Sequence, residues 1–438
     1  MQNKYTVGLY TLGCKVSQYE TQAIAEAFEA RGFRVLPFSA VCDAYVINTC
    51  TVTRESDRKS RQYIRRATAK NPRAAVAVIG CYSQRSPREV AEIKGVSVVI
   101  GTENKMSVVD RVLEILECRA HDGVTISTSE LEGAAFEPMC ITKAPRTRAY
   151  VKIEDGCESK CTYCAIKDAR GPVRSKPKDD VIKEVEGLSE SGTLEIVLTG
   201  IETGSYGRDF EQTYTLADLI AELDERRSAC RIRLGSLAPE LIGESFVERV
   251  RGVKILAPHF HLSVQSGSDA VLRAMKRRYN RRVALENIKR LKSAFPTAQF
   301  TTDMMVGFPG ESEEDFLDTL SFVREAKFLD VHVFAFSQRE GTPAFYMEGQ
   351  IDETEKRSRS ARLIAVKNEV REKVLEELVK IGEPLSVILE AWNGEYYSAH
   401  SDGFVEVCVE APRGMEGKLI EVVPVSHKNG VLYATFTD

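Results

Sequence analysis

The sequence lacks the features that would place the protein at a membrane or outside the cell. No stretch of the 438 residues approaches the run of about eighteen uncharged apolar residues that a transmembrane helix requires. The opening MQNKYTVGLYTLGCK has too short an apolar run for a secretory signal and no small-residue cleavage site. We therefore expect a cytoplasmic protein that involves no membrane.

A strong charge imbalance, internal repeats and low-complexity tracts are also missing. The formal net charge is only −4, so the composition as a whole does not indicate nucleic-acid binding. The eleven cysteines are an odd number in a chain without a secretory signal, which argues against a disulfide framework. We infer that the thiols are kept reduced for metal binding or catalysis.

The hydrophobic pattern predicts an α/β protein with several domains, because the chain is long for a single core. Over residues 1–117, short apolar runs alternate with amphipathic stretches, which predicts an N-terminal α/β domain with a parallel sheet. Residues 118–142 lose this periodicity and are predicted as a linker that carries a short strand.

Residues 143–375 contain six strand candidates that alternate with helical stretches and then a long helix. This order predicts a partial, TIM-like (β/α)6 barrel whose active face is built by the loops that follow the strands. Residues 376–438 contain short strands broken by Gly, Asn and Pro, which predicts a small C-terminal β-barrel.

The segment GCESKCTYC, residues 156–164, presents three cysteines spaced C-x3-C-x2-C. A structural zinc site almost always needs four Cys or His ligands, and the nearest further candidates are Cys140, His121 and His259. A 4Fe-4S cluster needs one ligand per iron, so three cysteines would leave one iron open for a substrate or cofactor. The spacing therefore favours an iron–sulfur cluster over zinc.

Three more cysteines each follow a predicted strand, namely Cys14, Cys50 and Cys81. The carboxyl ends of parallel strands lie along one edge of a sheet, so these thiols can meet and form a second three-cysteine cluster site. The alternative is that each is an ordinary buried cysteine. The other five are interpreted as packing or spare thiols: Cys42, Cys118, Cys140, Cys230 and Cys408.

With these two cysteine sets, the chain resembles the radical S-adenosylmethionine methylthiotransferase family over essentially its full length. TLGCKVSQYET, INTCTVT and IGCYSQ are similar to its N-terminal domain, and GCESKCTYC with ARGPVRS is similar to its radical core. HLSVQSGSDAVLRAMKRRY and TTDMMVGFPGESEEDF resemble later motifs, and the last segment resembles a TRAM domain.

The resemblance implies two 4Fe-4S clusters and S-adenosyl-L-methionine as cofactors. Cys157, Cys161 and Cys164 would hold the catalytic cluster, which reduces S-adenosylmethionine to methionine and a 5′-deoxyadenosyl radical. Cys14, Cys50 and Cys81 would hold an auxiliary cluster that presents the sulfur to be inserted. A radical is needed because an unactivated C–H bond has no acidic proton for general-base catalysis.

By the same resemblance, the loops after three strands would contact S-adenosylmethionine. The alternative for a glycine-rich loop after a strand is a simple turn. The candidate contact residues are Thr199, Gly200, Glu202, Gly204, Gln265, Ser266, Val306 and Gly307.

The sequence around the first cysteine is most similar to the MtaB-type branch, which acts on N6-threonylcarbamoyladenosine at position 37 of tRNA. An isopentenyladenosine in tRNA and an aspartate of a ribosomal protein are the alternative substrates. Ser17 replaces an asparagine common in this branch, and Glu202 replaces a histidine. The implied partners are the anticodon stem-loop of tRNA, a reducing electron donor and a sulfur source.

Local charge gives a separate indication about the substrate. Residues 54–73 hold eight Lys or Arg against two acids, and RAMKRRYNRR at 273–282 is a second basic stretch; either could bind phosphate or be a solvated helix face. Residues 382–438 hold nine acids and three bases, which keeps a basic ribosomal protein open as a substrate, although Trp392, Tyr396 and Tyr397 could stack on bases. A zinc-dependent RNA-binding module and a non-catalytic sulfur carrier are two further alternatives.

Overall fold

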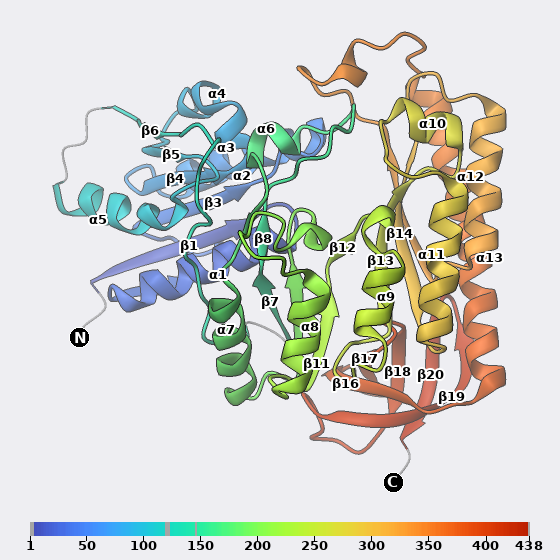
Figure 1. Ribbon diagram of the computed structural model, residues 1–438. Helices are drawn as coiled ribbons and strands as arrows, with labels where there is room; N and C mark the ends of the chain where they lie inside the picture. Colours follow the sequence, from blue (N-terminus) through green and yellow to red (C-terminus); the bar gives the residue numbers. More distant parts are fainter. Residues whose placement is uncertain (1–3, 119–122, 145–146, 437–438) are drawn as a thin grey trace.

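A six-stranded parallel sheet forms the N-terminal domain in the computed structural model, which describes residues 4–118, 123–144 and 147–436 (Figure 1). The strand order is β2-β1-β3-β4-β5-β6. The strands span Tyr5–Thr11 (β1), Phe33–Leu36 (β2), Ala44–Thr49 (β3), Ala75–Gly80 (β4), Val98–Ile100 (β5) and Thr125–Ser127 (β6). β3 and β4 are buried along their whole length, which is typical of central strands covered on both faces.

Helices cover both faces of this sheet. α1 (Lys15–Ala30) and α5 (Val108–Cys118) pack on one face, where Phe28 and Val112 join a common core with Val7. α2 (Arg54–Lys70), α3 (Cys81–Arg85) and α4 (Pro87–Ala91) pack on the other face through Ile64 and Val90. α2 begins after Thr53, whose hydroxyl accepts a hydrogen bond from the backbone N–H of Ser56 and caps the helix.

The segment between the first two domains is held in place by hydrogen bonds. β6 lies in it and adds the last strand of the N-terminal sheet. Farther along, the Tyr19 hydroxyl donates to the carbonyl of Met139 at 2.7 Å, and the Ile141 N–H donates to Glu184 at 2.7 Å. These bonds fix the segment between α1 and α7 of the following domain.

Parallel strands and their outer helices form the central domain at the six predicted strand positions, of which the third is divided into β11 and β12. Two sheets have the orders β11-β10-β7 and β12-β13-β14-β15, and Ile232 of β11 forms a bridge with Leu256, which precedes β13. The strands are Arg148–Lys152 (β7), Glu195–Thr199 (β10), Arg231–Leu234 (β11), Ser236–Leu237 (β12), His259–Gln265 (β13), Gln299–Val306 (β14) and Asp330–Ala335 (β15). The first and last strands, β7 and β15, are not paired with each other among the described residues, so the barrel is open on one side.

The helices on the outside of this barrel run from α6 to α13. Their bounds are Ile166–Arg170 (α6), Lys178–Glu190 (α7), Leu216–Glu225 (α8), Glu244–Val250 (α9), Asp269–Ala274 (α10), Arg281–Ala294 (α11), Glu313–Ala326 (α12) and Glu353–Ile381 (α13). A short antiparallel pair, β8 (Glu154–Asp155) and β9 (Arg174–Ser175), follows β7. Single turns of 3-10 helix occur at Lys105–Ser107 (η1), Thr203–Ser205 (η2), Pro239–Leu241 (η3) and Pro343–Phe345 (η4).

A closed five-stranded barrel ends the chain and lies under the central barrel (Figure 1). Its strands are Leu385–Trp392 (β16), Tyr397–Ser401 (β17), Glu406–Glu410 (β18), Leu419–Lys428 (β19) and Val431–Phe436 (β20), which confirms the predicted small β-barrel. Arg231 donates to Ser386, and Arg233 donates to the Asp402 carbonyl at 2.8 Å, so the C-terminal barrel covers the amino ends of the central strands.

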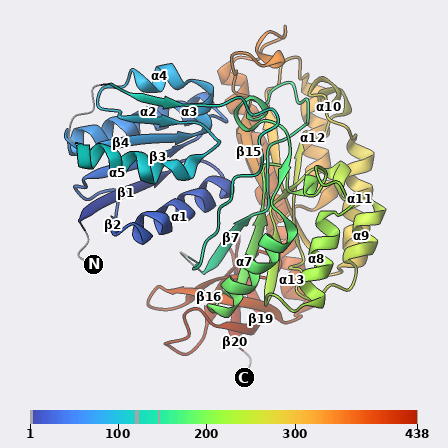
Figure 2. The ribbon, with the colours of Figure 1, turned by 60° about the vertical axis from the view of Figure 1, so that its left-hand side comes forward.

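The N-terminal domain packs beside the open side of the central barrel, and α1 contacts β7 directly (Figure 2). The beginning of α1 therefore lies where the two domains meet. In the described part of the chain, no helix has the length and apolar character needed to span a membrane.

Candidate functional site

The first cysteine set lies at the carboxyl ends of three adjacent strands. Cys14 follows β1, Cys50 follows β3 directly, and Cys81 opens α3 after β4, while β1, β3 and β4 are neighbours in the sheet. The thiols of Cys50 and Cys81 are buried and that of Cys14 is exposed. Each lies close enough to the others to interact electrostatically. The structure thus brings together three residues that are separated by more than thirty positions in the sequence.

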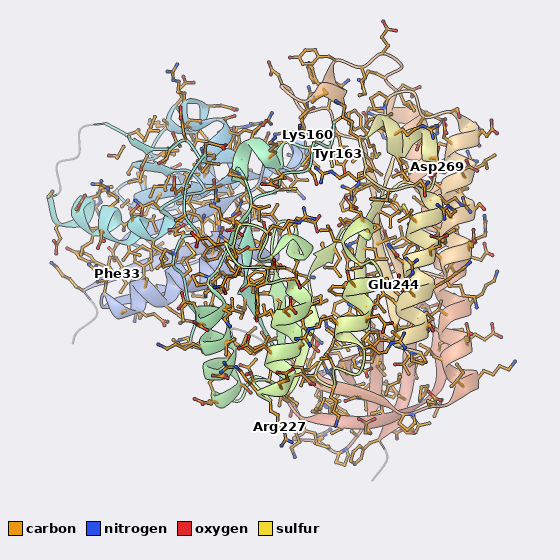
Figure 3. All side chains as sticks on the ribbon, in the orientation of Figure 1. Phe33, Lys160, Tyr163, Arg227, Glu244 and Asp269 are labelled. Atoms are coloured by element: carbon orange, nitrogen blue, oxygen red, sulfur yellow. The ribbon has the colours of Figure 1, made fainter. Side chains whose placement is uncertain are left out.

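The second cysteine set lies on one loop between β8 and α6. The Ser159 N–H approaches the sulfur of Cys157 and the Ile166 N–H approaches that of Cys164, both at 3.4 Å. These thiols also interact with Cys161, and all three are partly exposed. Figure 3 labels Lys160 and Tyr163, which place the loop in the upper part of the view, between the N-terminal domain and α10 of the central domain.

Glycines allow two of these cysteines to reach their positions. Gly156, before Cys157, has a φ of +90°, and a Cβ atom there would lie 1.8 Å from the carbonyl oxygen of Pro172. Gly80, before Cys81, has a φ of +98°, and its Cβ would lie 2.5 Å from Oδ1 of Asn48. Both positions need a left-handed backbone and a close approach, so both require glycine.

One arginine donates to each cysteine set. Nε of Arg170 lies 3.1 Å from Sγ of Cys81, and Nη1 of Arg277 lies 3.2 Å from Sγ of Cys161. Sequence reasoning missed both residues. Arg170 belongs to the motif ARGPVRS, and Arg277 belongs both to the motif HLSVQSGSDAVLRAMKRRY and to the basic stretch 273–282, but neither residue was assigned a contact with a cysteine. A guanidinium that donates to sulfur stabilises the thiolate form that binds metal.

Arg170 is the centre of a buried ion network between the two domains. Its Nη1 lies 2.6 Å from Glu20 of α1 and 3.1 Å from Asp155 of β8. Lys152 contacts both carboxylates, and Lys105 lies 3.3 Å from Glu20. Burial opposes ionisation, but Arg170, with Lys105 and Lys152, holds the pKa of Glu20 well below its usual range. This network carries more positive than negative charge beside Cys81.

Four of the six thiols are in environments that favour the neutral form when no metal is bound. Burial raises the pKa of Cys81 to about 12 and that of Cys164 to about 11. Burial also raises the pKa values of Cys50 and Cys157. A bound metal deprotonates a coordinating thiol outright, so metal binding would supply the charge that compensates the buried arginines.

The spacing of the sulfur atoms does not match a single metal ion. Three sulfurs on one zinc ion lie about 3.8 Å apart, because Zn–S bonds are ~2.3 Å and the geometry is tetrahedral. Among the described residues, three potential ligand atoms come within 4.8 Å of one another only at His261, Asp303 and His332. Neither cysteine set is that tight, so neither is arranged around a single zinc ion.

The candidate fourth zinc ligands lie in other surroundings. Cys140 is exposed, and the charged groups near it include those of Glu184 and Lys176. His259 bonds to the Thr301 hydroxyl at 3.0 Å and stacks on Phe404 near the floor of the barrel. His121 lies outside the described residues.

The predicted S-adenosylmethionine contacts lie after β10, β13 and β14, at the same end of the barrel as the cysteine loop. Burial raises the pKa of Glu202 to about 7, although Arg277 lies near it, and its carboxylate accepts from the Ala238 N–H at 3.1 Å. Ser266 is buried, and its hydroxyl contacts that of Thr319 at 3.3 Å. The remaining positions lie at strand ends or in the following turns: Thr199, Gly200, Gly204, Gln265, Val306 and Gly307.

The inner face of the barrel is polar. Along β13 and β14, Phe260, Leu262 and Met304 pack outward against the helices, so the alternate residues face inward. At the floor, Glu195 bonds to Arg233, Arg148 and Arg231; despite burial, these guanidinium groups lower its pKa to about 2. The inward residues of β13 to β15 include His259, His261, Thr301, Asp303 and His332.

The two basic stretches differ in the structure. On α2, Arg58 pairs with Glu55 and Arg61 pairs with Glu89, but Arg65 and Arg66 are exposed. Neither Arg65 nor Arg66 makes an ion pair with any described residue. They line one hollow of the surface with Arg58 and Arg61.

The stretch 273–282 is not a uniform basic surface. Arg277 turns inward to Cys161, Arg281 pairs with Glu325 and Arg282 pairs with Glu286. The idea that Tyr397 of the C-terminal barrel could stack on a base is also wrong, because its side chain is fully buried.

Two family models match the chain. Residues 6–101 match "Uncharacterized protein family UPF0004", and residues 151–323 match "Radical SAM superfamily". The first match contains Cys14, Cys50 and Cys81, and the second contains the loop with Cys157, Cys161 and Cys164.

Curated relatives cover nearly the whole length of the chain. A Bacillus subtilis protein named threonylcarbamoyladenosine tRNA methylthiotransferase MtaB is 39% identical over 95% of this chain and 93% of its own. An Alkaliphilus oremlandii protein named tRNA-2-methylthio-N(6)-dimethylallyladenosine synthase is 34% identical over 84% of this chain and 78% of its own. The fold resembles that of the radical S-adenosylmethionine methyltransferase TsrM from Kitasatospora setae, with a TM-score of 0.56, 16% identity and coverage of 79% of this chain and 77% of that one.

Proposed function

This chain belongs to the MtaB-type family of radical S-adenosylmethionine methylthiotransferases, and we propose that it converts N6-threonylcarbamoyladenosine at position 37 of tRNA to the 2-methylthio derivative. The observation that supports this substrate assignment is the 39% identity, over almost the full chain, to a relative named for that reaction. The relative named for dimethylallyladenosine is less similar, at 34% over a smaller share.

The chemistry rests on two cofactors of the family, the 4Fe-4S cluster and S-adenosylmethionine, which together supply a radical able to remove hydrogen from an unactivated C–H bond. Cys157, Cys161 and Cys164 would hold the cluster that works with S-adenosylmethionine. Cys14, Cys50 and Cys81 would hold the auxiliary cluster, which would supply the sulfur to be inserted.

The other residues of this chain hold and shield these groups. Arg170 and Arg277 donate hydrogen bonds to one thiolate of each set. The turns after β10, β13 and β14 bind S-adenosylmethionine, with Thr199, Gly200, Glu202, Gly204, Gln265, Ser266, Val306 and Gly307 as the contact positions. The exposed arginines of α2, directly after Cys50, bind the phosphates of the anticodon stem-loop. A reducing electron donor and a sulfur source act as further partners.

The test is anaerobic reconstitution followed by incubation with reductant, sulfide, S-adenosylmethionine and tRNA that carries N6-threonylcarbamoyladenosine. After digestion of the tRNA, mass spectrometry of the nucleosides measures the product. A methylthio mass gain on that nucleoside is the expected result, and tRNA that carries isopentenyladenosine serves as the control substrate.

Two negative results have different meanings. Formation of 5′-deoxyadenosine without thiolation of the expected nucleoside, together with thiolation of the isopentenyl tRNA or of a ribosomal protein, would contradict the proposed substrate but not the radical chemistry. A failure to cleave S-adenosylmethionine by the fully reconstituted, reduced protein would contradict the chemistry itself.

A further inference from the structure

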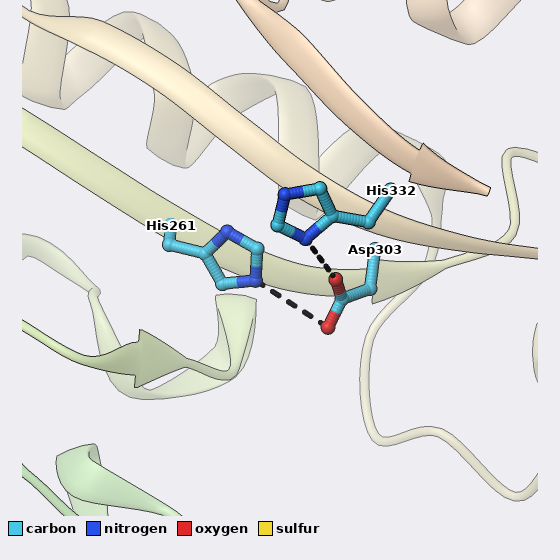
Figure 4. Close-up of side chains that lie close together, drawn as sticks. All are labelled: His261, Asp303 and His332. Atoms are coloured by element: carbon cyan, nitrogen blue, oxygen red, sulfur yellow. Dashed lines mark hydrogen bonds and ion pairs between the residues drawn. The ribbon is translucent and has the colours of Figure 1, made fainter. Parts of the chain in front are cut away.

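A polar cluster lies on the inner wall of the central barrel, near its open side (Figure 4). His261, Asp303 and His332 come from the neighbouring strands β13, β14 and β15. Nδ1 of His332 lies 3.1 Å from Oδ1 of Asp303, and Nε2 of His261 lies 3.4 Å from Oδ2. Among the described residues, no other group of three His, Cys, Asp or Glu side chains brings one ligand atom each within 4.8 Å of the others.

The register of the three strands fixes where these side chains project. Asp303 and His332 are directly paired across β14 and β15. His261 is paired with Thr301, which lies two residues before Asp303 and therefore on the same face of β14. The three potential ligands thus project from adjacent positions of one parallel sheet, and their arrangement does not depend on a loop.

Hydrogen bonds behind His261 orient its ring. Its Nδ1 lies 2.9 Å from the hydroxyl oxygen of Thr301, and the same oxygen lies 3.0 Å from Nε2 of His259. When Nδ1 of His261 donates to this hydroxyl, its Nε2 carries the lone pair that a metal ion requires and faces Asp303. A histidine that binds a metal almost always donates its other N–H to such a partner.

The distances in the cluster match the edges of a coordination sphere. With metal–ligand bonds of ~2.1 Å, neighbouring ligand atoms lie ~3.0 Å apart around an octahedral ion and ~3.4 Å apart around a tetrahedral ion. Asp303 presents one oxygen to each imidazole, at 3.1 and 3.4 Å. The side chain of His332 is 54% exposed, so an ion can reach the cluster from solvent and the ring can turn toward it.

The charge of the cluster also suits a cation. Asp303 forms no ion pair with a lysine or arginine in the described part of the chain, and its partners are two imidazoles, which are neutral when they bind a metal. One carboxylate and two neutral imidazoles leave a negative charge that a divalent ion compensates. Imidazole nitrogen favours zinc and iron(II), whereas Mg²⁺ and Ca²⁺ prefer oxygen ligands.

We propose that His261, Asp303 and His332 bind a divalent transition-metal ion of the zinc and iron(II) class, separate from the two cysteine sets. The ion joins β15, the edge strand of the open barrel, to β14 and β13. Three protein ligands leave at least one coordination position for water or for an oxygen atom of a bound molecule. The site uses none of the six cysteines and does not depend on the proposed substrate.

The experiment measures zinc binding by the full chain after anaerobic reconstitution of its cysteine sets with iron and sulfide. A chelating resin removes loosely held iron, and Zn²⁺ is the probe because it binds such ligands more tightly than Fe²⁺. Equilibrium dialysis gives the Kd and the zinc content per chain, and X-ray absorption at the zinc edge, with one equivalent of zinc, identifies the ligand atoms. The variants are His332→Gln, Asp303→Asn and Thr301→Val. His427→Gln is the matched control, because His427 also contacts a carboxylate, Glu372 at 2.8 Å, but belongs to no three-ligand group among the described residues.

The wild type is expected to bind one zinc ion per chain more than His332→Gln or Asp303→Asn, with only nitrogen and oxygen ligands at about 2.0 to 2.2 Å. Thr301→Val, which removes the hydrogen bond behind His261, should weaken zinc binding by about 10- to 100-fold, and each ligand variant should weaken it by at least about 100-fold. His427→Gln should bind zinc as the wild type does. Far-ultraviolet circular dichroism and iron content verify that each variant is folded.

Equal zinc content and Kd in the wild type and in both ligand variants would overturn the inference, and so would sulfur ligands at about 2.3 Å at the zinc edge of the wild type. An equal loss in His427→Gln would also overturn it, because any accessible histidine would then account for the zinc. None of these measurements uses RNA or S-adenosylmethionine, so a failure of the proposed function would not alter their outcome.

Discussion

The two cysteine sets are built in opposite ways. The set of Cys157, Cys161 and Cys164 lies within eight residues on one loop, and backbone N–H groups of this loop and of the first residue of α6 approach two of its sulfurs. The set of Cys14, Cys50 and Cys81 is assembled from three strands and exists only when the sheet is folded. One site is therefore a local property of the chain, and the other is a property of the fold.

The difference extends to what surrounds each set. The strand-end set is joined to the central domain by the network of Arg170, Glu20 and Asp155, in which every member is buried. The loop set receives Arg277 from a turn of its own domain. The auxiliary site thus depends on the packing of two domains, whereas the loop site depends on one.

The largest expected effect comes from removing one ligand of each set. Cys161→Ala should abolish the cleavage of S-adenosylmethionine, because the loop cluster loses a ligand and the radical cannot form. Cys50→Ala should retain cleavage but lose thiolation of the RNA. The measurements are 5′-deoxyadenosine and methylthionucleoside by mass spectrometry after single incubations.

Cys230→Ala, at an exposed cysteine outside both sets, controls for nonspecific damage. Full thiolation by Cys50→Ala would show that the strand-end set is not a cluster site. Loss of 5′-deoxyadenosine in both variants to the same degree would show that the two sets do not have separate roles.

The contrast also explains how much the sequence alone could predict. The loop set is recognisable from spacing, and the strand-end set from the apolar runs TVGLY, YVIN and AVAVIG before each cysteine, because parallel strands end along one edge. The six barrel strands and the long helix α13 were predicted on the same grounds of periodicity. Strand β2 was missed because it is short and only partly buried.

The supporting residues could not be predicted in this way. Arg170 and Arg277 lie 89 and 116 positions from the sulfurs that they contact, so only the folded chain shows these pairs. The periodicity of apolar residues indicates which face of a helix or strand is buried. It does not indicate which polar groups are buried next to one another.

A smaller and more selective effect is expected from the two arginines. Arg170→Lys keeps the charge in the buried network but loses the Nε–H donor to Cys81. Hydrogen bonds to cluster sulfurs stabilise the reduced state, so the midpoint potential of the auxiliary cluster should fall, by roughly 40 mV if the bond differs by about 1 kcal/mol between the two states. Arg277→Lys should lower only the potential of the loop cluster.

Redox titrations followed by electron paramagnetic resonance measure each potential separately, in backgrounds that lack the three cysteines of the other set. Arg174→Lys is the matched control for Arg170, because it lies in the same motif and 3.8 Å from Asp155 but makes no contact with Cys81. Equal shifts of both clusters in Arg170→Lys would mean that the residue acts on general stability and not on one thiolate.

The smallest expected effect concerns the basic stretches that accompany the two sets. Replacing Arg65 and Arg66 of α2 by Glu should weaken tRNA binding roughly tenfold at 0.1 M salt and lower the slope of log Kd against log salt by about 1.5, since each phosphate contact contributes about 0.7 to 0.9. The same change at Arg281 and Arg282 is the control, because their guanidinium groups are already paired with Glu325 and Glu286 and should contribute little.

Fluorescence anisotropy of a labelled anticodon stem-loop at several salt concentrations measures both effects. An equal loss from the two pairs would mean that the RNA lies across both domains, and an unchanged slope in the α2 variant would exclude α2 as the phosphate-binding surface.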